Sequence, residues 1–233
     1  MNLTMMEEGF RKSKKILNAC NLFQNENYTR GLMFKPSKFS RDFFTLAQNG
    51  DYHKLYQLAI TNKDYDILLN DYSFFQFSCE SNASNKIVKY RYAYYETPSE
   101  FPTYEEFVNE LGFSYIECGE EFFQDYEQVI DEAKLKKTVT PLRYDYDEDL
   151  HEPPVHPISH LHLGFQNEIR VPIKYILTPH AFVSFVIRHI YWNKWKDLMS
   201  DSKFCSIYYV KAECKILPEK HFGIDEEKDF YIA

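Results

Sequence analysis

The strongest constraint on the fold is a change in the spacing of apolar residues close to Ser73. Upstream of it, apolar residues recur three and four positions apart, which is the spacing of one face of a helix. Downstream they alternate with polar residues, most clearly in 86–96, where three tyrosines share one face and basic residues the other. Together with the run 74–79 and the polar turn 80–85, this alternation predicts a β-hairpin.

Helix signals lie on both sides of this hairpin. Asp51 can cap a helix, Thr103 and Glu106 form a capping box, and Thr178-Pro179 supplies an N-cap followed by a proline in the first turn. The predicted helices lie at about 10–17, 39–47, 51–59, 103–112, 120–136 and 179–195.

Three more short β-like runs are found at 140–147, 158–165 and 168–173, and another at 205–210. A tight turn at Gln166-Asn167 joins two of them, and such short connections are typical of antiparallel neighbours. We therefore expect an α+β fold, with a mostly antiparallel sheet of about five strands and with helices at the N-terminus and packed on one face.

A single domain, 1–233, is the simplest organisation for a chain of 233 residues. Only 7 of them are glycine, and no Pro, Gly or Ser rich stretch suggests a flexible linker. Within this domain we expect a helical N-terminal region, residues 1–70, and a sheet-containing region that holds the candidate site, residues 71–233.

Composition excludes several classes of protein. The formal net charge of −8 argues against broad binding to long nucleic acid, although it permits a local basic pocket. The N-terminal residues 1–11 contain no apolar stretch for a signal peptide or a membrane span, so we expect a cytoplasmic protein without a membrane partner. The five cysteines are scattered and form no C-x-x-C pair, which predicts buried thiols rather than disulfides or a zinc site. They are Cys20, Cys79, Cys118, Cys205 and Cys214.

A cluster of Arg, Asp and His is predicted between Pro141 and Pro172. Residues two apart in a strand share a face, so Arg143, Asp145 and Asp147 point one way, and His160 and His162 share a face of the next β-like run. If the two strands pair in matching orientation, these side chains meet on one face of the sheet. Arg170 on the following strand can join them, and Gly164 leaves open space beside them. His156 lies just upstream.

Two chemistries suit such a cluster. In the first, His160 and His162 act as acid and base in RNA cleavage without a metal, Arg143 and Arg170 bind phosphate, and Asp145 orients an imidazole. In the second, a divalent metal is held by the two histidines with the carboxylates of Asp145 and Asp147. The pattern favours no cofactor and leaves the metal open.

A third interpretation is structural, because His-x-His pairs in strands are commonly solvent-facing without any ligand. His180, in the first turn of its predicted helix, can reach the site, whereas His189 is expected on the helix surface. The sequence contains no Gly-rich phosphate loop, G-x-S-x-G or H-E-x-x-H motif.

Four short motifs in the later half of the chain resemble those of an uncharacterised bacterial family classed as a domain of unknown function. They are PLRYDY at 141–146, HPISHLHLG at 156–164, RVP at 170–172 and PHAF at 179–182. The family is similar in overall length and in the order of these motifs, so the resemblance covers most of the chain.

A looser likeness is to small toxins of bacterial toxin–antitoxin modules, in which an R-Y/W-D strand precedes a His-rich strand. It implies an RNA-directed nuclease used in growth arrest or phage defence, with Arg143, Asp145, His160 and His162 at the corresponding positions. This chain is much longer and has extra N-terminal helices.

Three hypotheses follow from the sequence. The first is a metal-independent endoribonuclease, or a related nucleic-acid phosphodiesterase, of a toxin or phage-defence system. The second is a metal-dependent nuclease or hydrolase that uses the same residues. The third is a non-catalytic accessory subunit whose acidic, Tyr-rich surface binds a larger protein partner, such as an antitoxin or a defence ATPase. The partners expected are therefore RNA or other nucleic acid, or such a protein.

Overall fold

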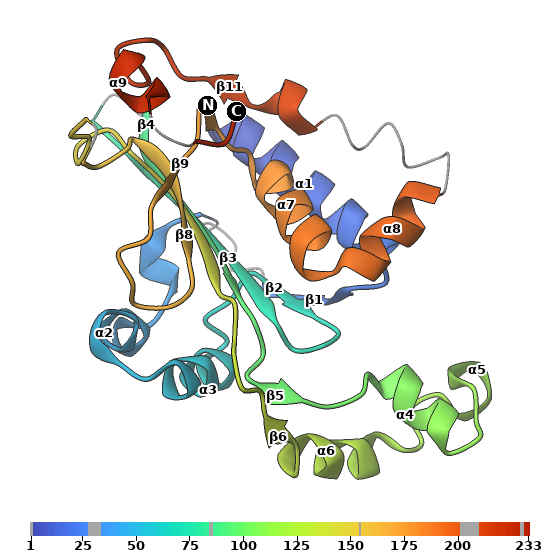
Figure 1. The fold of residues 1–233 in the computed structure, drawn as a ribbon. Helices are drawn as coiled ribbons and strands as arrows, with labels where there is room; N and C mark the ends of the chain where they lie inside the picture. The colour runs from blue at the N-terminus through green and yellow to red at the C-terminus, as the bar shows by residue number, and fades with distance from the viewer. Residues whose placement is uncertain (1, 28–33, 84–85, 154, 201–209, 229–230) are drawn as a thin grey trace.

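A seven-stranded sheet, antiparallel throughout, forms the centre of the molecule in the computed structural model (Figure 1), which describes all residues except 1, 28–33, 84–85, 154, 201–209 and 229–230. The strand order is β1-β2-β3-β4-β7-β8-β9. In chain order the strands are β1 (Phe23–Glu26), β2 (Ile67–Leu69), β3 (Phe74–Ser81), β4 (Ile87–Tyr95), β7 (Leu142–Asp147), β8 (Ser159–Leu163) and β9 (Val171–Pro172). The predicted α+β class and antiparallel sheet are confirmed.

The predicted hairpin is formed by β3 and β4, with Phe77 opposite Tyr92. The sheet is larger than expected because β1 and β2 extend it from within the N-terminal region that was predicted to be helical. β2 is a run of three buried apolar residues, Ile67 to Leu69. A run of this kind has no alternation, so its strand character is not visible in the sequence.

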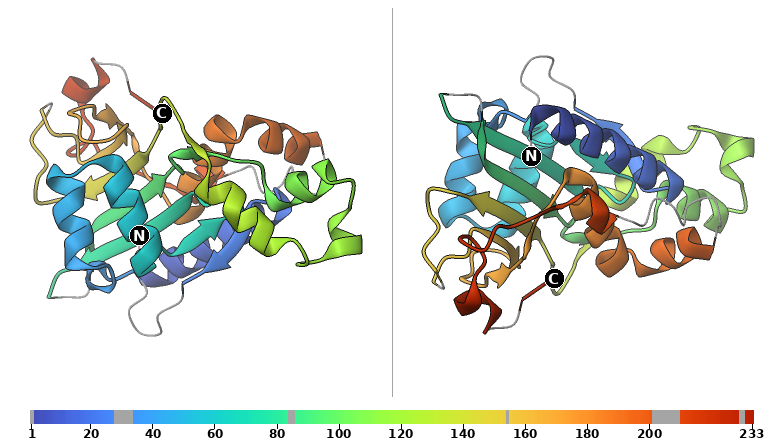
Figure 2. Two further views of the ribbon diagram at one scale, coloured as in Figure 1. Left: turned by 90° about the horizontal axis from the view of Figure 1, so that it is seen from below. Right: turned by 90° about the horizontal axis from the view of Figure 1, so that it is seen from above.

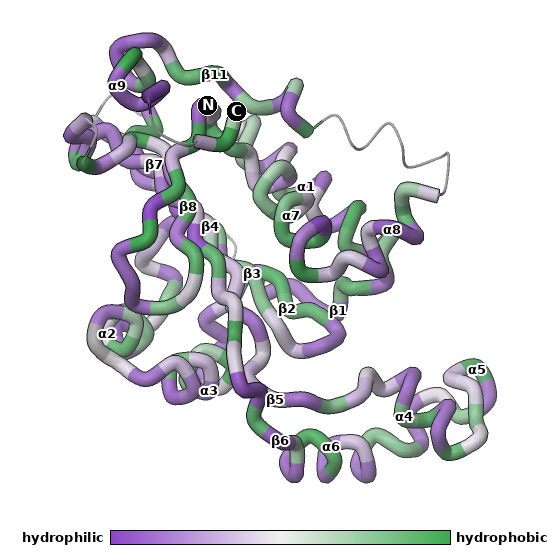
Figure 3. Tube along the Cα trace, viewed as in Figure 1, coloured by the Kyte–Doolittle hydropathy of each residue, from purple (hydrophilic) through white to green (hydrophobic). Residues whose placement is uncertain are grey.

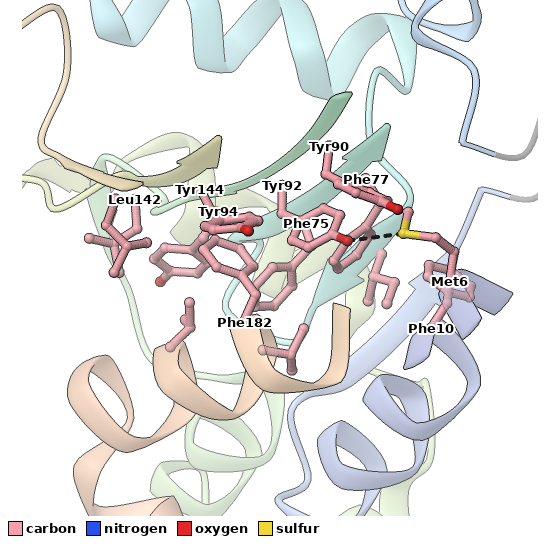
Figure 4. Packing of buried hydrophobic residues seen from close by; sticks show 14 of the residues in the cluster. Met6, Phe10, Phe75, Phe77, Tyr90, Tyr92, Tyr94, Leu142, Tyr144 and Phe182 are labelled. Carbon is pink, nitrogen blue, oxygen red and sulfur yellow. Dashed lines mark hydrogen bonds between the residues drawn. The ribbon is translucent and has the colours of Figure 1, made fainter. Parts of the chain in front are cut away.

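Three helices cover one face of the sheet: α1 (Leu3–Ala19), α7 (Pro179–Ile190) and α8 (Trp192–Ser200). The core beneath them is aromatic (Figure 4): Phe75, Tyr92 and Phe182 are fully buried, and the Tyr92 hydroxyl donates to Met6 Sδ at 2.9 Å. Thr178 caps α7 by accepting from the Ala181 amide, as predicted. The predicted helix 179–195 is divided in two, because α7 ends at Ile190 and α8 begins at Trp192.

The other face carries α2 (Arg41–Asn49) and α3 (Tyr52–Asn62), as the two further views show (Figure 2). Phe43 and Leu55 pack there against Phe74 in a second core. The next residue, Phe75, belongs to the first core, beneath α1 and α7, because successive strand residues point to opposite faces. Helices therefore cover both faces, whereas the pattern indicated one. The predicted cap Asp51 accepts from the Lys54 amide at the start of α3, and Ser40 caps α2 by accepting from the Phe43 amide.

Between β4 and β7 the chain leaves the sheet and forms a projecting arm, residues 99–135 (Figure 1). The arm contains β5 (Ser99–Glu100), α4 (Tyr104–Glu110), α5 (Tyr115–Cys118), α6 (Phe123–Asp131) and β6 (Lys134–Leu135). β5 pairs with β6 at its base, and Tyr104 stacks on Phe123 with ring centroids 4.4 Å apart. The predicted capping box of Thr103 and Glu106 begins α4. α6 is shorter than the predicted helix 120–136.

The C-terminal residues add a small ribbon of β10 (Tyr175–Ile176) and β11 (Lys215–Ile216), the 3-10 helix η3 (Val210–Glu213) and the short helix α9 (Ile224–Glu227). Another 3-10 turn, η1, spans Pro36–Lys38. The strand predicted at 205–210 lies almost wholly outside the described residues. Among the cysteines, Cys20 is buried, the side chains of Cys79, Cys118 and Cys214 are only partly buried, and Cys205 is not described. None of the helices in the described segments of the chain is long and apolar enough to cross a lipid bilayer.

Candidate functional site

The polar cluster lies where β7 and β8 pair. Asp145 stands opposite His160, and Arg143 stands opposite His162. The intervening residues Tyr144 and Leu161 are buried in the first core, so the polar side chains occupy the other face of the sheet. The structure therefore brings together four of the five residues predicted to form the site.

Three of these side chains form a tight, buried group. His160 Nε2 is 3.0 Å from His162 Nε2, and His162 Nε2 is 3.3 Å from Asp145 Oδ2. One ligand atom from each residue lies within 4.8 Å of the other two. His160 is 1% exposed, and His162 and Asp145 are each 7% exposed. Nitrogen and oxygen atoms at this spacing can share one metal ion.

The environment of His160 determines its tautomer. Its Nδ1 is 2.7 Å from the carbonyl oxygen of Pro157, which can only accept, so Nδ1 carries a proton. Burial lowers the pKa of His160 to about 4, and the ring is therefore neutral near pH 7. A neutral ring protonated at Nδ1 presents the lone pair of Nε2 to the cluster. This is the form in which histidine binds a metal, and a backbone carbonyl is a common partner for the other nitrogen.

Asp145 is ionised and held by two arginines. Its Oδ1 is 3.0 Å from Arg91 Nε and its Oδ2 is 2.9 Å from Arg143 Nε. Burial by itself raises the pKa of Asp145, but the hydrogen bond from His162 and the two guanidinium charges outweigh it and hold that pKa well below its usual range. The arginine side chains remain 50% and 41% exposed, so their outer N–H groups can also bind an anion from solution.

Arg91 belongs to this site although it was absent from the predicted set. It lies on β4 directly opposite Asp145. Alternation in 86–96 indicates that Arg91 points away from the tyrosine face. The sequence does not reveal that β4 and β7 are neighbours, because 46 residues separate them. The only available signal was the shared pattern of charge on two alternating strands.

Three other predicted residues lie outside the group. Asp147, proposed as a metal ligand, instead bonds Lys89 Nζ at 3.0 Å, because that lysine stands directly opposite it on β4. Arg170 precedes β9 and donates to Glu168 at 2.9 Å, with its Nε buried and without a partner among the described residues. His180 lies on α7, on the opposite face of the sheet, and its Nδ1 is 3.1 Å from Glu213 Oε2.

His156 is a near neighbour of the site. Its ring lies edge-on to that of His160, with ring centroids 5.0 Å apart. The turn that carries it is closed by backbone hydrogen bonds between Glu152 and His156. This contact helps to fix the orientation of the His160 ring.

A cavity of about 330 Å³ opens beside His162 and Arg143. Its other walls come from the C-terminal turn of α2, the end of β4, the start of β7 and the loop 164–168. They comprise Ala47, Gln48, Ala93, Tyr94, Tyr95, Pro141, Leu142, Gly164, Phe165, Gln166, Asn167 and Glu168. Phe165 packs on Tyr52, because Gly164 with φ +85° ends the strand and turns the chain.

A family model for an uncharacterized conserved protein, DUF2290, matches residues 23–225. The chain belongs to this family. The match covers the sheet, the site and the arm, which agrees with the resemblance to a domain of unknown function over most of the chain. No curated protein and no solved structure matches the chain.

Proposed function

We propose that the protein is a metal-dependent phosphodiesterase that acts on nucleic acid, with His160, His162 and Asp145 as the metal ligands. The proposal rests above all on one observation: a ligand atom from each of these buried residues lies within 4.8 Å of the other two. The tautomer of His160, set by the Pro157 carbonyl, supports it further. Two histidines with one carboxylate are a common ligand set for catalytic zinc and for iron.

The same geometry argues against the metal-independent mechanism. In metal-independent RNA cleavage the general base takes a proton from the ribose 2′-hydroxyl and the general acid gives one to the leaving oxygen. These two oxygens lie on either side of the phosphorus, so the two catalytic nitrogens must leave room for the phosphate between them. Here His160 Nε2 and His162 Nε2 are within hydrogen-bonding distance of each other. His160 is also almost completely buried. We therefore favour the metal-dependent alternative.

Each residue has a distinct role in this proposal. A bound metal would polarise a phosphoryl oxygen and lower the pKa of a water molecule. Arg91 and Arg143 would bind the remaining phosphate oxygens through their exposed N–H groups and stabilise charge that develops on them. Asp145 holds both guanidinium groups in place, and the Pro157 carbonyl orients His160.

Metal content and cleavage test the proposal together. Purified protein is expected to bind about one zinc, manganese or iron per chain and to hydrolyse bis(p-nitrophenyl) phosphate and labelled RNA. Both properties should be lost in His160→Ala and His162→Ala and retained in His180→Ala, which changes an equally buried histidine on the other face of the sheet. The proposal is overturned if the wild type binds no metal, or if cleavage continues in excess chelator. The latter result would restore the metal-independent endoribonuclease.

We propose a second role, docking of a basic protein partner, because the arm has unusual chemistry. Its eleven Asp and Glu side chains are all exposed and are accompanied by a single basic residue, Lys134. The tip also exposes four apolar side chains, Leu111, Phe113, Tyr115 and Ile116, the last of them 96% exposed. In the chain trace coloured by hydropathy, hydrophobic residues occur at α5, at the far end of the arm (Figure 3). An exposed apolar patch with an acidic rim suits a partner with an apolar pocket surrounded by Lys and Arg. Such a partner could be an antitoxin or a defence ATPase.

Cross-linking in the native host tests this second role. A photoreactive residue at Ile116 is expected to capture a protein through a basic segment, in a complex that dissociates as salt is raised. Ile116→Ser should abolish the complex, and Ile224→Ser, which changes another exposed isoleucine outside the arm, should preserve it. Capture through an acidic surface, or equal loss in both variants, contradicts docking by the arm.

A further inference from the structure

We infer that the cavity beside His162 and Arg143 holds one nucleobase of an unpaired strand, so that the preferred substrates are single-stranded. The inference rests on the proposed phosphodiesterase function and specifies its substrate. Its starting point is position: Arg143, which would bind the phosphate, and His162, a proposed metal ligand, both form part of the cavity wall. A group attached to a phosphate at Arg143 through one sugar would therefore lie in this cavity.

The size of the cavity favours a single nucleotide. Its volume is about 330 Å³, which is close to the lower limit of about 300 Å³ for pockets that enclose a small molecule. Two stacked base pairs of a duplex are far larger than this. Residues of α2 and of the loop 164–168 both line the cavity, so it cannot widen toward either of them without moving that element.

The lining suits the chemistry of a base. Tyr95 and Phe165 contribute aromatic rings, and a base presents a flat π-surface that stacks on such rings. Gln48 is exposed at the rim and carries both a donor and an acceptor that can bind the edge of a base. A phosphate group alone would use no aromatic surface.

The walls are held in place before any ligand binds. Tyr95 stacks on Phe74 with ring centroids 4.9 Å apart. Phe165 packs edge-on against Tyr52, with ring centroids 5.3 Å apart. In the loop, Asn167 donates to the Leu163 carbonyl and accepts from the Ile169 amide. A cavity formed in advance costs little ordering entropy on binding.

A preference for single-stranded substrates follows from this arrangement. A base in a duplex is paired along its edge and stacked on both faces, and it must leave the helix to enter a separate cavity, at a cost in free energy. A base in a single strand needs no such step. Cleavage of single-stranded substrates is therefore expected to be at least tenfold faster than cleavage of the same sequence in a duplex.

Binding of small probes tests occupancy of the cavity. In calorimetry with manganese present, the four nucleoside monophosphates are expected to bind at least tenfold tighter than ribose 5-phosphate, which lacks only the base. Gln48→Trp places a large ring at the rim and should weaken nucleotide binding at least tenfold while leaving binding of inorganic phosphate unchanged. Thr45→Trp, at an exposed position of the same helix outside the cavity, should bind like the wild type.

The outcomes separate this inference from the function on which it rests. If the protein binds metal and hydrolyses bis(p-nitrophenyl) phosphate, but nucleotides bind no tighter than ribose 5-phosphate, or duplex and single strand are cleaved equally, the base site is refuted and the phosphodiesterase stands. If neither metal binding nor hydrolysis is found, the proposed function itself fails. Equal melting temperatures of the two tryptophan variants exclude misfolding as the cause of weaker binding.

Discussion

At the scale of single residues, the site is determined by the partner of each polar atom. His160 is 1% exposed and yet has both ring nitrogens engaged, one by the Pro157 carbonyl and one by His162. Asp145 keeps its charge because two arginines and a histidine surround it. Near pH 7, burial keeps His160 neutral and these partners keep Asp145 ionised.

Stability is expected to decrease in mild acid because of His160. Its pKa is about 4 in the folded protein and about 6.5 in an unfolded chain. Between these values the unfolded chain binds a proton that the folded protein does not, so the free energy of unfolding decreases as pH falls from about 6.5 to 4, by up to about 3 kcal/mol. The low pKa of Asp145 affects stability mainly below about pH 4, because an unfolded Asp titrates near 3.9.

Urea unfolding with chelator present, at pH 7.5 and at pH 5.0, measures the effect. The decrease between the two values should be smaller in His160→Gln than in the wild type. His180, whose pKa is also lowered by burial, contributes to the same decrease in stability, and this contribution should persist in His160→Gln. Identical decreases in the two proteins would show that His160 is not neutral in the folded state.

Removal of Arg91 should weaken phosphate binding without removing the metal. A hydrogen bond to a charged group is worth about 1.5–3 kcal/mol, so Arg91→Ala is expected to lower the affinity for phosphate about tenfold or more. Metal content should remain near that of the wild type, because Arg143 and His162 still hold Asp145. Arg188→Ala, at an exposed arginine on the other face of the sheet, is the control. Loss of metal from Arg91→Ala contradicts the assigned role.

At the scale of elements, packing decides properties that local sequence rules would assign differently. Gly9 lies within α1, where glycine is a poor helix former compared with alanine. A Cβ atom at this position would be 2.8 Å from the Pro179 ring of α7. The close approach of the two helices therefore requires glycine, and the rigid proline ring cannot turn aside as a flexible side chain would.

Gly9→Ala is accordingly expected to destabilise the protein, although the same change in an isolated helix stabilises it by about 1 kcal/mol. The clash with Pro179 should lower the free energy of unfolding by about 1–3 kcal/mol. Chemical denaturation measures it, with Asn18→Ala, in an exposed position of the same helix, as the reference. An increase in stability for Gly9→Ala would mean that α1 and α7 approach each other less closely than this contact requires.

At the scale of the whole molecule, charge is strongly segregated. The arm holds eleven of the 35 acidic residues and one of the 27 Lys and Arg residues, which leaves 24 acidic and 26 basic side chains elsewhere. The net charge of −8 is thus a property of the arm, and the remainder of the chain is slightly positive. An argument from total charge against nucleic-acid binding does not apply to the face that carries Arg91 and Arg143.

Deletion of the arm is therefore expected to strengthen RNA binding. The arm begins and ends side by side, since the Lys136 amide donates to the Pro98 carbonyl at 2.7 Å, so a short Gly/Ser turn can replace 99–135. The shortened protein should keep its metal and a cooperative melting transition. It should bind single-stranded RNA more tightly at low salt, with a steeper salt dependence than the full chain. Unchanged affinity and salt dependence would show that the arm does not repel RNA.

Local sequence determined most helices and the alternating strands, whereas tertiary structure determined β1, β2 and the site. Alternation in 86–96 and 142–147 specified which side chains share a face, and the capping residues Asp51, Thr103 and Thr178 specified where helices begin, because these features depend on neighbours within a few positions. The pairing of β4 with β7, which brings Arg91 to Asp145, depends on contacts between residues 54 positions apart. The redirection of Asp147 to Lys89 and of His180 to Glu213 likewise followed from packing partners that no local pattern encodes.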